Sequence, residues 1–142
     1  MNTTPKLDRE LTRAIKSYQQ WFGSYTRSGE LKKVQVWLTI KDGLIEFLTP
    51  GDSYKAKRVR RNPQVVCFLG SKNGPSVAGT AEIVIDPGAL GNVYNRYWKS
   101  QPLMMVLLFA TIRKRIKAGN QVVIRVRPNE PNPLAGLTDP VV

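Results

Sequence analysis

Residues 49–63, TPGDSYKAKRVRRNP, follow directly after the apolar run LIEFL at residues 44–48. The Pro-Gly-Asp sequence at 50–52 predicts a turn, the basic residues after it predict a short helix, and Asn62-Pro63 ends that helix. A strand, a tight turn and a helix start with hydroxyl and cationic side chains are typical of a phosphate site, because the first N–H groups of a helix have no partner within it. The charges alone favour a solvated basic helix between two strands, but the order of these parts favours the phosphate site.

The overall charge requires an anionic partner or another explanation. The chain has 22 Lys and Arg residues against 10 Asp and Glu residues, a net charge of +12 and a pI near 10.2. Such a charge favours nucleic acid, an anionic membrane surface or a polyanionic small molecule as the partner. Stacking of bases needs aromatic and basic residues together on a strand face, and the predicted strands lack this pattern, so we expect no nucleic-acid partner.

The scarce residue types also limit the function. There is no histidine, which excludes histidine-based catalytic relays, and we expect no metal site. The only cysteine, Cys67, cannot form an intrachain disulfide, and its apolar neighbours predict a buried thiol in a reducing compartment. The N-terminus lacks the apolar core of a signal peptide, and the longest apolar run, residues 103–112, is too short to cross a bilayer. We therefore expect a cytoplasmic protein.

Hydrophobic periodicity and turn residues predict the remaining elements of a single domain over residues 1–142. These are an N-terminal helix over 1–22, strands over 32–40, 44–49, 64–70, 77–86 and 121–127, a helical region over 89–118 interrupted by Pro102, and a loose proline-rich tail over 128–142. Lys41-Asp42-Gly43 predicts a hairpin turn, and Gly79 indicates a close backbone approach or a bend. Several short antiparallel strands with few helices predict a small closed or half-closed β-barrel.

Several short motifs follow one another along the chain at compatible spacings. They are Val34-Gln35-Val36-Trp37, Asp42-Gly43, Phe47-Leu48-Thr49, Ser53-Tyr54-Lys55-Ala56-Lys57-Arg58, Arg61-Asn62-Pro63, Gly79-Thr80-Ala81-Glu82, Tyr97-Trp98 and Val122-Val123-Ile124-Arg125-Val126. In this order they resemble the split β-barrel flavin and deazaflavin superfamily, best known from pyridoxamine 5'-phosphate oxidase, and in particular its F420-dependent branch. The resemblance spans about Tyr25 to Pro128. It implies a mainly β, FMN-binding-like split β-barrel flanked by helices.

The resemblance also implies a homodimer with two cofactor sites between the subunits. The cofactor would be coenzyme F420, with FMN as the alternative. By similarity, three residues would hold the cofactor phosphate, two more cations would lie near it, and the backbone of two strand residues would lie against the ring system: Thr49, Ser53 and Lys55; Lys57 and Arg58; Val36 and Trp37. The family usually has proline before this Val-Trp pair, whereas this chain has Gln35, whose N–H can change the ring contacts or the strand pairing.

The implied function is an oxidoreductase that uses F420 for hydride transfer to or from a small organic substrate. The net charge of +12 suits F420, which is more anionic than FMN. Such cofactors carry the hydride chemistry themselves, so no catalytic residue is predicted. The alternative is a non-catalytic or FMN-using protein that binds a flavin or tetrapyrrole on the same barrel.

Two further features have more than one interpretation. Trp37 can stack on a ring or lie in a dimer interface, and Tyr97 and Trp98 are typical of helix packing, with a substrate-pocket wall as the second reading. The apolar helix at residues 103–118 fits the core or a dimer interface better than a membrane surface, because no polar face precedes its terminal cations.

Overall fold

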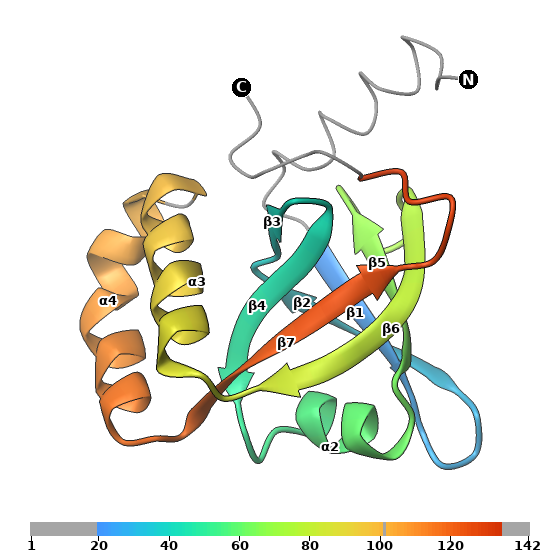
Figure 1. The fold of residues 1–142 in the computed structure, drawn as a ribbon, viewed down its shortest axis with the longest axis horizontal. Coiled ribbons are helices and arrows are strands. Elements are labelled where there is room, and N and C mark those ends of the chain that lie inside the picture. Colours follow the sequence, from blue (N-terminus) through green and yellow to red (C-terminus); the bar gives the residue numbers. More distant parts are fainter. Residues whose placement is uncertain (1–19, 101, 135–142) are drawn as a thin grey trace, which may run out of the picture.

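Seven strands of the described chain form one antiparallel sheet that curls into a half-barrel (Figure 1). The computed structural model describes residues 20–100 and 102–134. Within these ranges the elements are β1 Gln20–Tyr25, β2 Leu31–Val36, β3 Thr39–Lys41, β4 Leu44–Pro50, α2 Tyr54–Arg61, β5 Gln64–Leu69, β6 Ser76–Val84, α3 Pro87–Ser100, α4 Pro102–Lys117 and β7 Gln121–Pro128. The order across the sheet is β2-β1-β5-β6-β7-β4-β3. The predicted β-barrel flanked by helices is confirmed.

The two edge strands of this sheet, β2 and β3, are neighbours along the chain. Trp37 and Leu38 join them, and there the backbone leaves its pairing with β1 and enters a pairing with β4. The prediction of one continuous strand over 32–40 is therefore wrong. Side-chain alternation continues through the break, and the change of partner is set by distant strands. The barrel stays split between β2 and the last part of β4.

The first described strand, β1, corrects the predicted N-terminal helix. Residues 20–22 belong to β1, where Gln20 lies opposite Val36 of β2 and Leu69 of β5. Phe22 is fully buried, and its ring meets that of Phe47 edge-on at 4.9 Å between centroids. Strand pairing on both sides has overridden the helical spacing here. The rest of the predicted helix, 1–19, lies outside the described residues.

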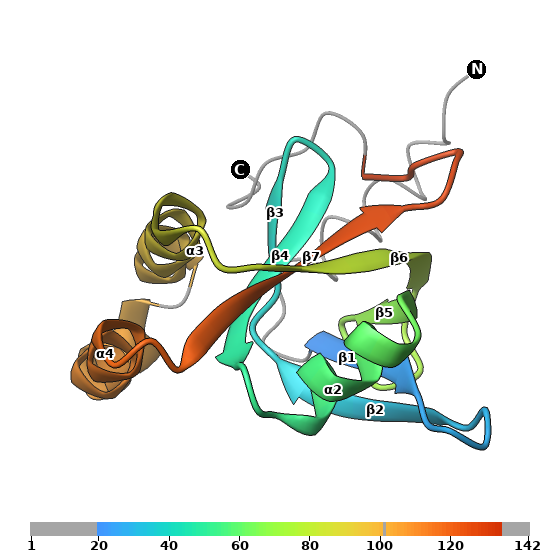
Figure 2. The same cartoon turned by 60° about the horizontal axis from the view of Figure 1, so that its bottom comes forward.

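Two apolar clusters hold the fold together. One fills the barrel interior and includes Phe22, Ile45, Phe47 and Ile124. The other lies between the helices α3 and α4 and the outer face of β4 and β7, and it includes Val93, Tyr97, Met105 and Val123. Figure 2 shows both helices on this side of the crossing strands. Strand β4 is consequently covered on both faces: Ile45 and Phe47 point into the barrel, while Glu46 and Leu48 point towards α3.

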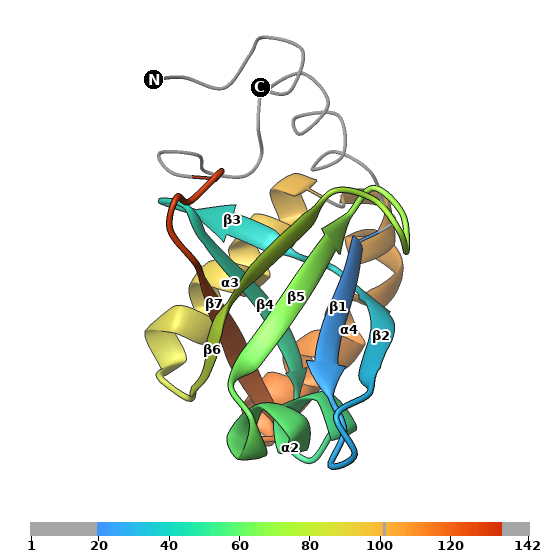
Figure 3. The ribbon, with the colours of Figure 1, turned by 90° about the vertical axis from the view of Figure 1, so that its right-hand side faces the viewer.

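The short basic helix α2 closes one end of the barrel (Figure 3). Its own residues Ala56 and Val59 are buried, and the Ser53 side chain caps its N-terminus by accepting the Ala56 N–H at 3.2 Å. Asn62 is its C-terminal cap, as the sequence predicts. The predicted turn, helix and helix end over residues 50–63 are thus confirmed.

Several local predictions also hold. Asp42 and Gly43 have φ angles of 51° and 78° in the hairpin between β3 and β4, as such a turn requires. A Cβ atom at Gly79 would lie 2.5 Å from the Arg127 carbonyl oxygen, so the predicted close approach is real.

The tail is not loose throughout its described part, because Leu134 is fully buried. Residues 135–142 lie outside the described residues. None of the described helices has the length and apolar character needed to cross a membrane.

Candidate functional site

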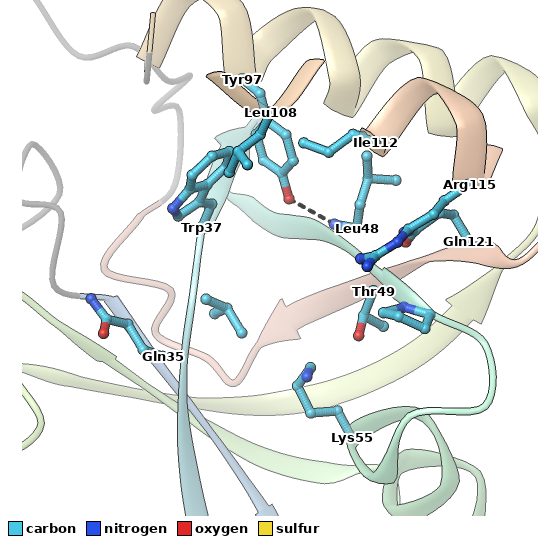
Figure 4. A pocket seen from close by; sticks show the side chains of 12 residues that line it. Gln35, Trp37, Leu48, Thr49, Lys55, Tyr97, Leu108, Ile112, Arg115 and Gln121 are labelled. Atoms are coloured by element: carbon cyan, nitrogen blue, oxygen red, sulfur yellow. Dashed lines mark hydrogen bonds between the residues drawn. The ribbon is translucent and has the colours of Figure 1, made fainter. Parts of the chain in front are cut away.

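A pocket of about 280 Å³ opens where the barrel is split (Figure 4). One wall is the end of β2 with Trp37 after it, and the opposite wall is the end of β4. Helix α2 borders one end, and α3, α4 and the start of β7 complete the site. The lining residues, in that order, are Gln35, Val36 and Trp37; Leu48, Thr49 and Pro50; Lys55; Tyr97; Leu108, Ile112 and Arg115; and Gln121.

The aromatic part of the pocket is built by Trp37 and Tyr97. Their rings meet edge-on, with centroids 5.3 Å apart. The Tyr97 hydroxyl accepts the Leu48 backbone N–H at 2.8 Å, where β4 has passed the end of β3 (Figure 4). The phenol therefore satisfies a donor that a neighbouring strand would otherwise take. Burial raises the pKa of Tyr97 far above its ordinary value, against a smaller lowering by the Leu48 N–H, so the phenol stays neutral.

The polar end of the pocket lies at the start of α2. Thr49 is 2% exposed and donates its hydroxyl to the Ser53 hydroxyl at 3.2 Å. Lys55, in the first turn of the helix, extends its ammonium group into the pocket (Figure 4). Burial lowers the pKa of Lys55, and the nearby Arg58 lowers it further. A bound anion would offset both effects, so this end of the pocket is suited to a phosphate.

The structure gathers four of the seven predicted cofactor-binding residues in the pocket lining: Val36, Trp37, Thr49 and Lys55. Ser53 lies one hydrogen bond away, through Thr49. Lys57 and Arg58 are not in the lining; their cationic groups lie 5.7 and 5.5 Å from the centre of the Tyr54 ring. Binding of a cofactor by these residues stays a prediction.

Sequence reasoning missed two polar residues of the lining, Arg115 and Gln121. Arg115 occurs in a run of cations at the end of α4, and the run does not show which cation faces the barrel. Gln121 starts β7 and is 6% exposed. The sequence allowed Tyr97 either a role in helix packing or a place in the pocket wall, and it has both. It is 3% exposed within a packed cluster and also lines the pocket.

The lining fits a ring-bearing anion. Among the described residues it has two cations, Lys55 and Arg115, and no carboxylate. Trp37, Leu48, Leu108 and Ile112 supply apolar surface for a planar ring. Ligand pockets commonly span about 300–1,000 Å³, so a long cofactor tail would extend outside this one. The donor set therefore fits the phosphate and ring of a flavin-type cofactor.

Comparisons with known proteins agree with this architecture. No protein-family model matches the sequence, and no curated protein matches it. The conserved hypothetical protein Rv2991 from Mycobacterium tuberculosis has a similar structure, with a TM-score of 0.69 and 21% identity over 92% of this chain and 83% of that one. An F420 reductase gives a TM-score of 0.54 and 17% identity over 82% of this chain and 91% of its own.

A third similar structure is a Listeria innocua protein provisionally assigned as a pyridoxamine 5'-phosphate oxidase. It gives a TM-score of 0.61 and 15% identity over 87% of this chain and 94% of its own. At these identities the similarity establishes the fold and leaves the activity open. The chain has the split-barrel fold of the pyridoxamine 5'-phosphate oxidase-like proteins.

Proposed function

We propose that the protein is an oxidoreductase of the split-barrel class that binds coenzyme F420 and transfers hydride to or from a small organic substrate. One observation carries the proposal: a phosphate-type end, with Lys55 and Thr49 at the start of α2, and an aromatic end, with Trp37, belong to one pocket. The similarity in fold to an F420 reductase supports the choice of cofactor.

Each part of the pocket has a role in this proposal. Lys55, Thr49 and the N-terminus of α2 hold the phosphate, with Ser53, Lys57 and Arg58 adding hydroxyl and positive charge nearby. The backbone at Val36 and Trp37 lies against the ring system. Leu108 and Ile112 exclude water from it. When bound, the deazaflavin supplies the hydride chemistry, and the protein supplies binding and orientation.

The second candidate is binding of FMN, with or without catalysis, and one observation favours it. Within the described part of the chain the pocket has one phosphate-type end, at α2, and the one phosphate of FMN satisfies it as well as F420 does. The net charge of +12 favours F420, the more anionic of the two.

A titration separates these candidates. Purified protein is titrated with F420 and with FMN at moderate salt, and ligand fluorescence is followed. Tighter binding of F420 is the expected result, and turnover of the reduced cofactor with a panel of quinone and enone acceptors then tests catalysis. Tighter binding of FMN would overturn the choice of cofactor. Binding of neither would refute the proposal.

We further propose a cytoplasmic homodimer. Several large apolar side chains at the end of α3 and along α4 are exposed: Trp98, Leu103, Met104, Val106, Leu107, Leu108 and Phe109. An apolar patch of this kind usually marks an interface, and a second copy of the chain is the partner that the resemblance implies. The free, buried thiol of Cys67 suits a reducing compartment. Light scattering should give a dimer for the wild type and a monomer for Leu107→Glu.

A further inference from the structure

We propose that Arg115 and Gln121 form a second polar subsite of the pocket, which selects substrates carrying a negative charge on a planar ring. Only the reaction of the bound substrate rests on the proposed function. Binding of such a ring depends on the pocket alone. Arg115 is a specificity-determining residue in this proposal, and Gln121 is a positioning residue that acts through Arg115.

The first observation is the charge balance around Arg115. It has no ion pair with any carboxylate of residues 20–100 and 102–134, and its guanidinium group extends towards the pocket (Figure 4). The lining residues that the structure describes include no acidic side chain to neutralise it. Two cations facing one pocket repel each other, and a bound anion relieves that repulsion.

The second observation is independent of charge. Gln121 is 6% exposed, and its side-chain oxygen Oε1 accepts no hydrogen bond within the described part of the chain. A buried polar atom without a partner costs about 1–3 kcal/mol, which favours any arrangement that supplies a donor. Gln121 lines the same pocket as Arg115, which precedes it by six residues across the α4–β7 turn. The guanidinium has five N–H donors, so it has donors both for Oε1 and for a bound anion.

The position of this subsite indicates what it binds. Lys55 and Thr49 belong to α2 and β4, whereas Arg115 and Gln121 belong to α4 and β7. The phosphate end and the new subsite therefore come from separate segments of the chain. Leu108 and Ile112 of α4, the helix that carries Arg115, add apolar surface that suits a flat ring. The chemistry that fits is a conjugated ring with an attached carboxylate, enolate or phenolate.

A matched pair of probes tests the subsite. Lawsone (2-hydroxy-1,4-naphthoquinone) is an anion at neutral pH, and menadione (2-methyl-1,4-naphthoquinone) is a neutral ring of nearly the same size. Their binding to the full-length protein is measured by isothermal titration calorimetry, together with that of F420 and FMN. Arg115→Gln should weaken lawsone binding about tenfold, as expected for one lost charge-assisted contact, and change menadione and cofactor binding less than twofold.

Further variants separate a specific contact from a general charge effect. Arg113→Gln removes the same charge from an exposed position of α4 outside the lining, and should leave the ratio of the two affinities unchanged. Arg115→Lys should restore part of the preference for lawsone. Gln121→Leu should reduce the preference while leaving menadione binding intact, which loss of fold would not do.

The possible results either support the subsite or overturn it. Equal weakening of both probes by Arg115→Gln would refute it, because packing and not charge would then be lost. A loss confined to F420 would assign Arg115 to the cofactor and equally refute it. Retained discrimination between the probes in a protein that binds neither F420 nor FMN would support the subsite and refute the proposed function.

Discussion

The charges on the outer face of β4 differ from those at its end beside the pocket. On the outer face, the carboxylate of Glu46 lies between Arg96 of α3 and Arg125 of β7. The Arg125 Nε lies 2.6 Å from one carboxylate oxygen, and Arg96 binds the other and also donates to the Thr39 hydroxyl at 3.1 Å. At the pocket, Lys55 and Arg115 belong to a lining whose described residues include no carboxylate.

This difference separates the charges that hold the fold from those available to a ligand. Glu46 is 4% exposed and Arg96 is 8% exposed, so neither can gain much from water and each depends on the other. The pocket cations keep some contact with solvent, and neither forms an ion pair within residues 20–100 and 102–134. We infer that the outer network holds α3 on the sheet, whereas the pocket cations are available to bind an anion.

The largest expected effect comes from breaking the outer network. Glu46→Gln leaves two guanidinium groups next to an uncharged amide, one of them, Arg96, buried, and should lower the free energy of unfolding by about 3–5 kcal/mol. Urea denaturation followed by tryptophan fluorescence measures it. Glu82→Gln is the matched control: its side chain is 60% exposed and lies 3.6 Å from Arg125, so the loss should be below about 1 kcal/mol. Equal losses would show that burial does not distinguish the two pairs.

Removing a pocket cation should weaken ligand binding and leave the stability nearly unchanged, the reverse of what breaking the outer network does. Lys55→Ala should weaken binding of the phosphate-bearing cofactor by about 1.5–3 kcal/mol, the value of one charge-assisted contact, with little change in stability. Fluorescence titration gives the affinity. Lys99→Ala, an exposed lysine at the end of α3, is the control for general charge and should leave the affinity unchanged. Unchanged affinity in Lys55→Ala would remove the phosphate-site assignment.

Tyr97 belongs to both regions, because α3 carries it and its hydroxyl reaches the pocket wall. Tyr97→Phe leaves the Leu48 N–H without its acceptor and should lower the free energy of unfolding by about 1–3 kcal/mol. Tyr94→Phe on the same helix, outside the pocket lining, should have a much smaller effect in the same denaturation experiment. Equal losses of unfolding free energy in the two variants would contradict a stabilising role for the hydrogen bond to β4.

The smallest expected effect is a pH dependence of ligand binding. Burial, with Arg58 nearby, places the pKa of Lys55 below its ordinary value of 10.5. Lys55 is charged below that lowered pKa, so affinity for a phosphate-bearing ligand should be full there and fall as the pH rises through it. Folding of the free protein should gain stability over the same rise. Titrations at successive pH values measure the fall, and Lys55→Arg should abolish it, since arginine stays charged.

Local signals predicted much of the fold. The turn at Asp42-Gly43, the helix stop at Asn62 and the close approach at Gly79 each follow from one residue's chemistry, and all are present. The misread segments depend on distant partners. Gln20–Tyr25 becomes a strand through pairing with β2 and β5, and the break at Trp37 comes from a change of partner between β1 and β4. No local pattern encodes either event.

The candidate site divides in the same way. Thr49 and Lys55 belong to one continuous stretch, and the sequence predicts them together. Arg115 reaches the pocket through the rotation of α4 about its axis, and Gln121 reaches it through the pairing of β7 with Pro50 of β4. The neighbouring cations Arg113 and Lys114 have the same charge but are not in the pocket lining. Residue type predicted the first pair, and tertiary packing decides the second.

One backbone hydrogen bond joins the chain segments next to the two pocket cations, Lys55 and Arg115. The Gly51 N–H, just before α2, donates to the Asn120 carbonyl oxygen at 2.8 Å, just before β7. Lys55 follows one end of this link by four residues, and Arg115 precedes the other end by five. The backbone segments that precede Lys55 and follow Arg115 are therefore joined by main-chain atoms, and a side-chain substitution at either cation leaves this link in place.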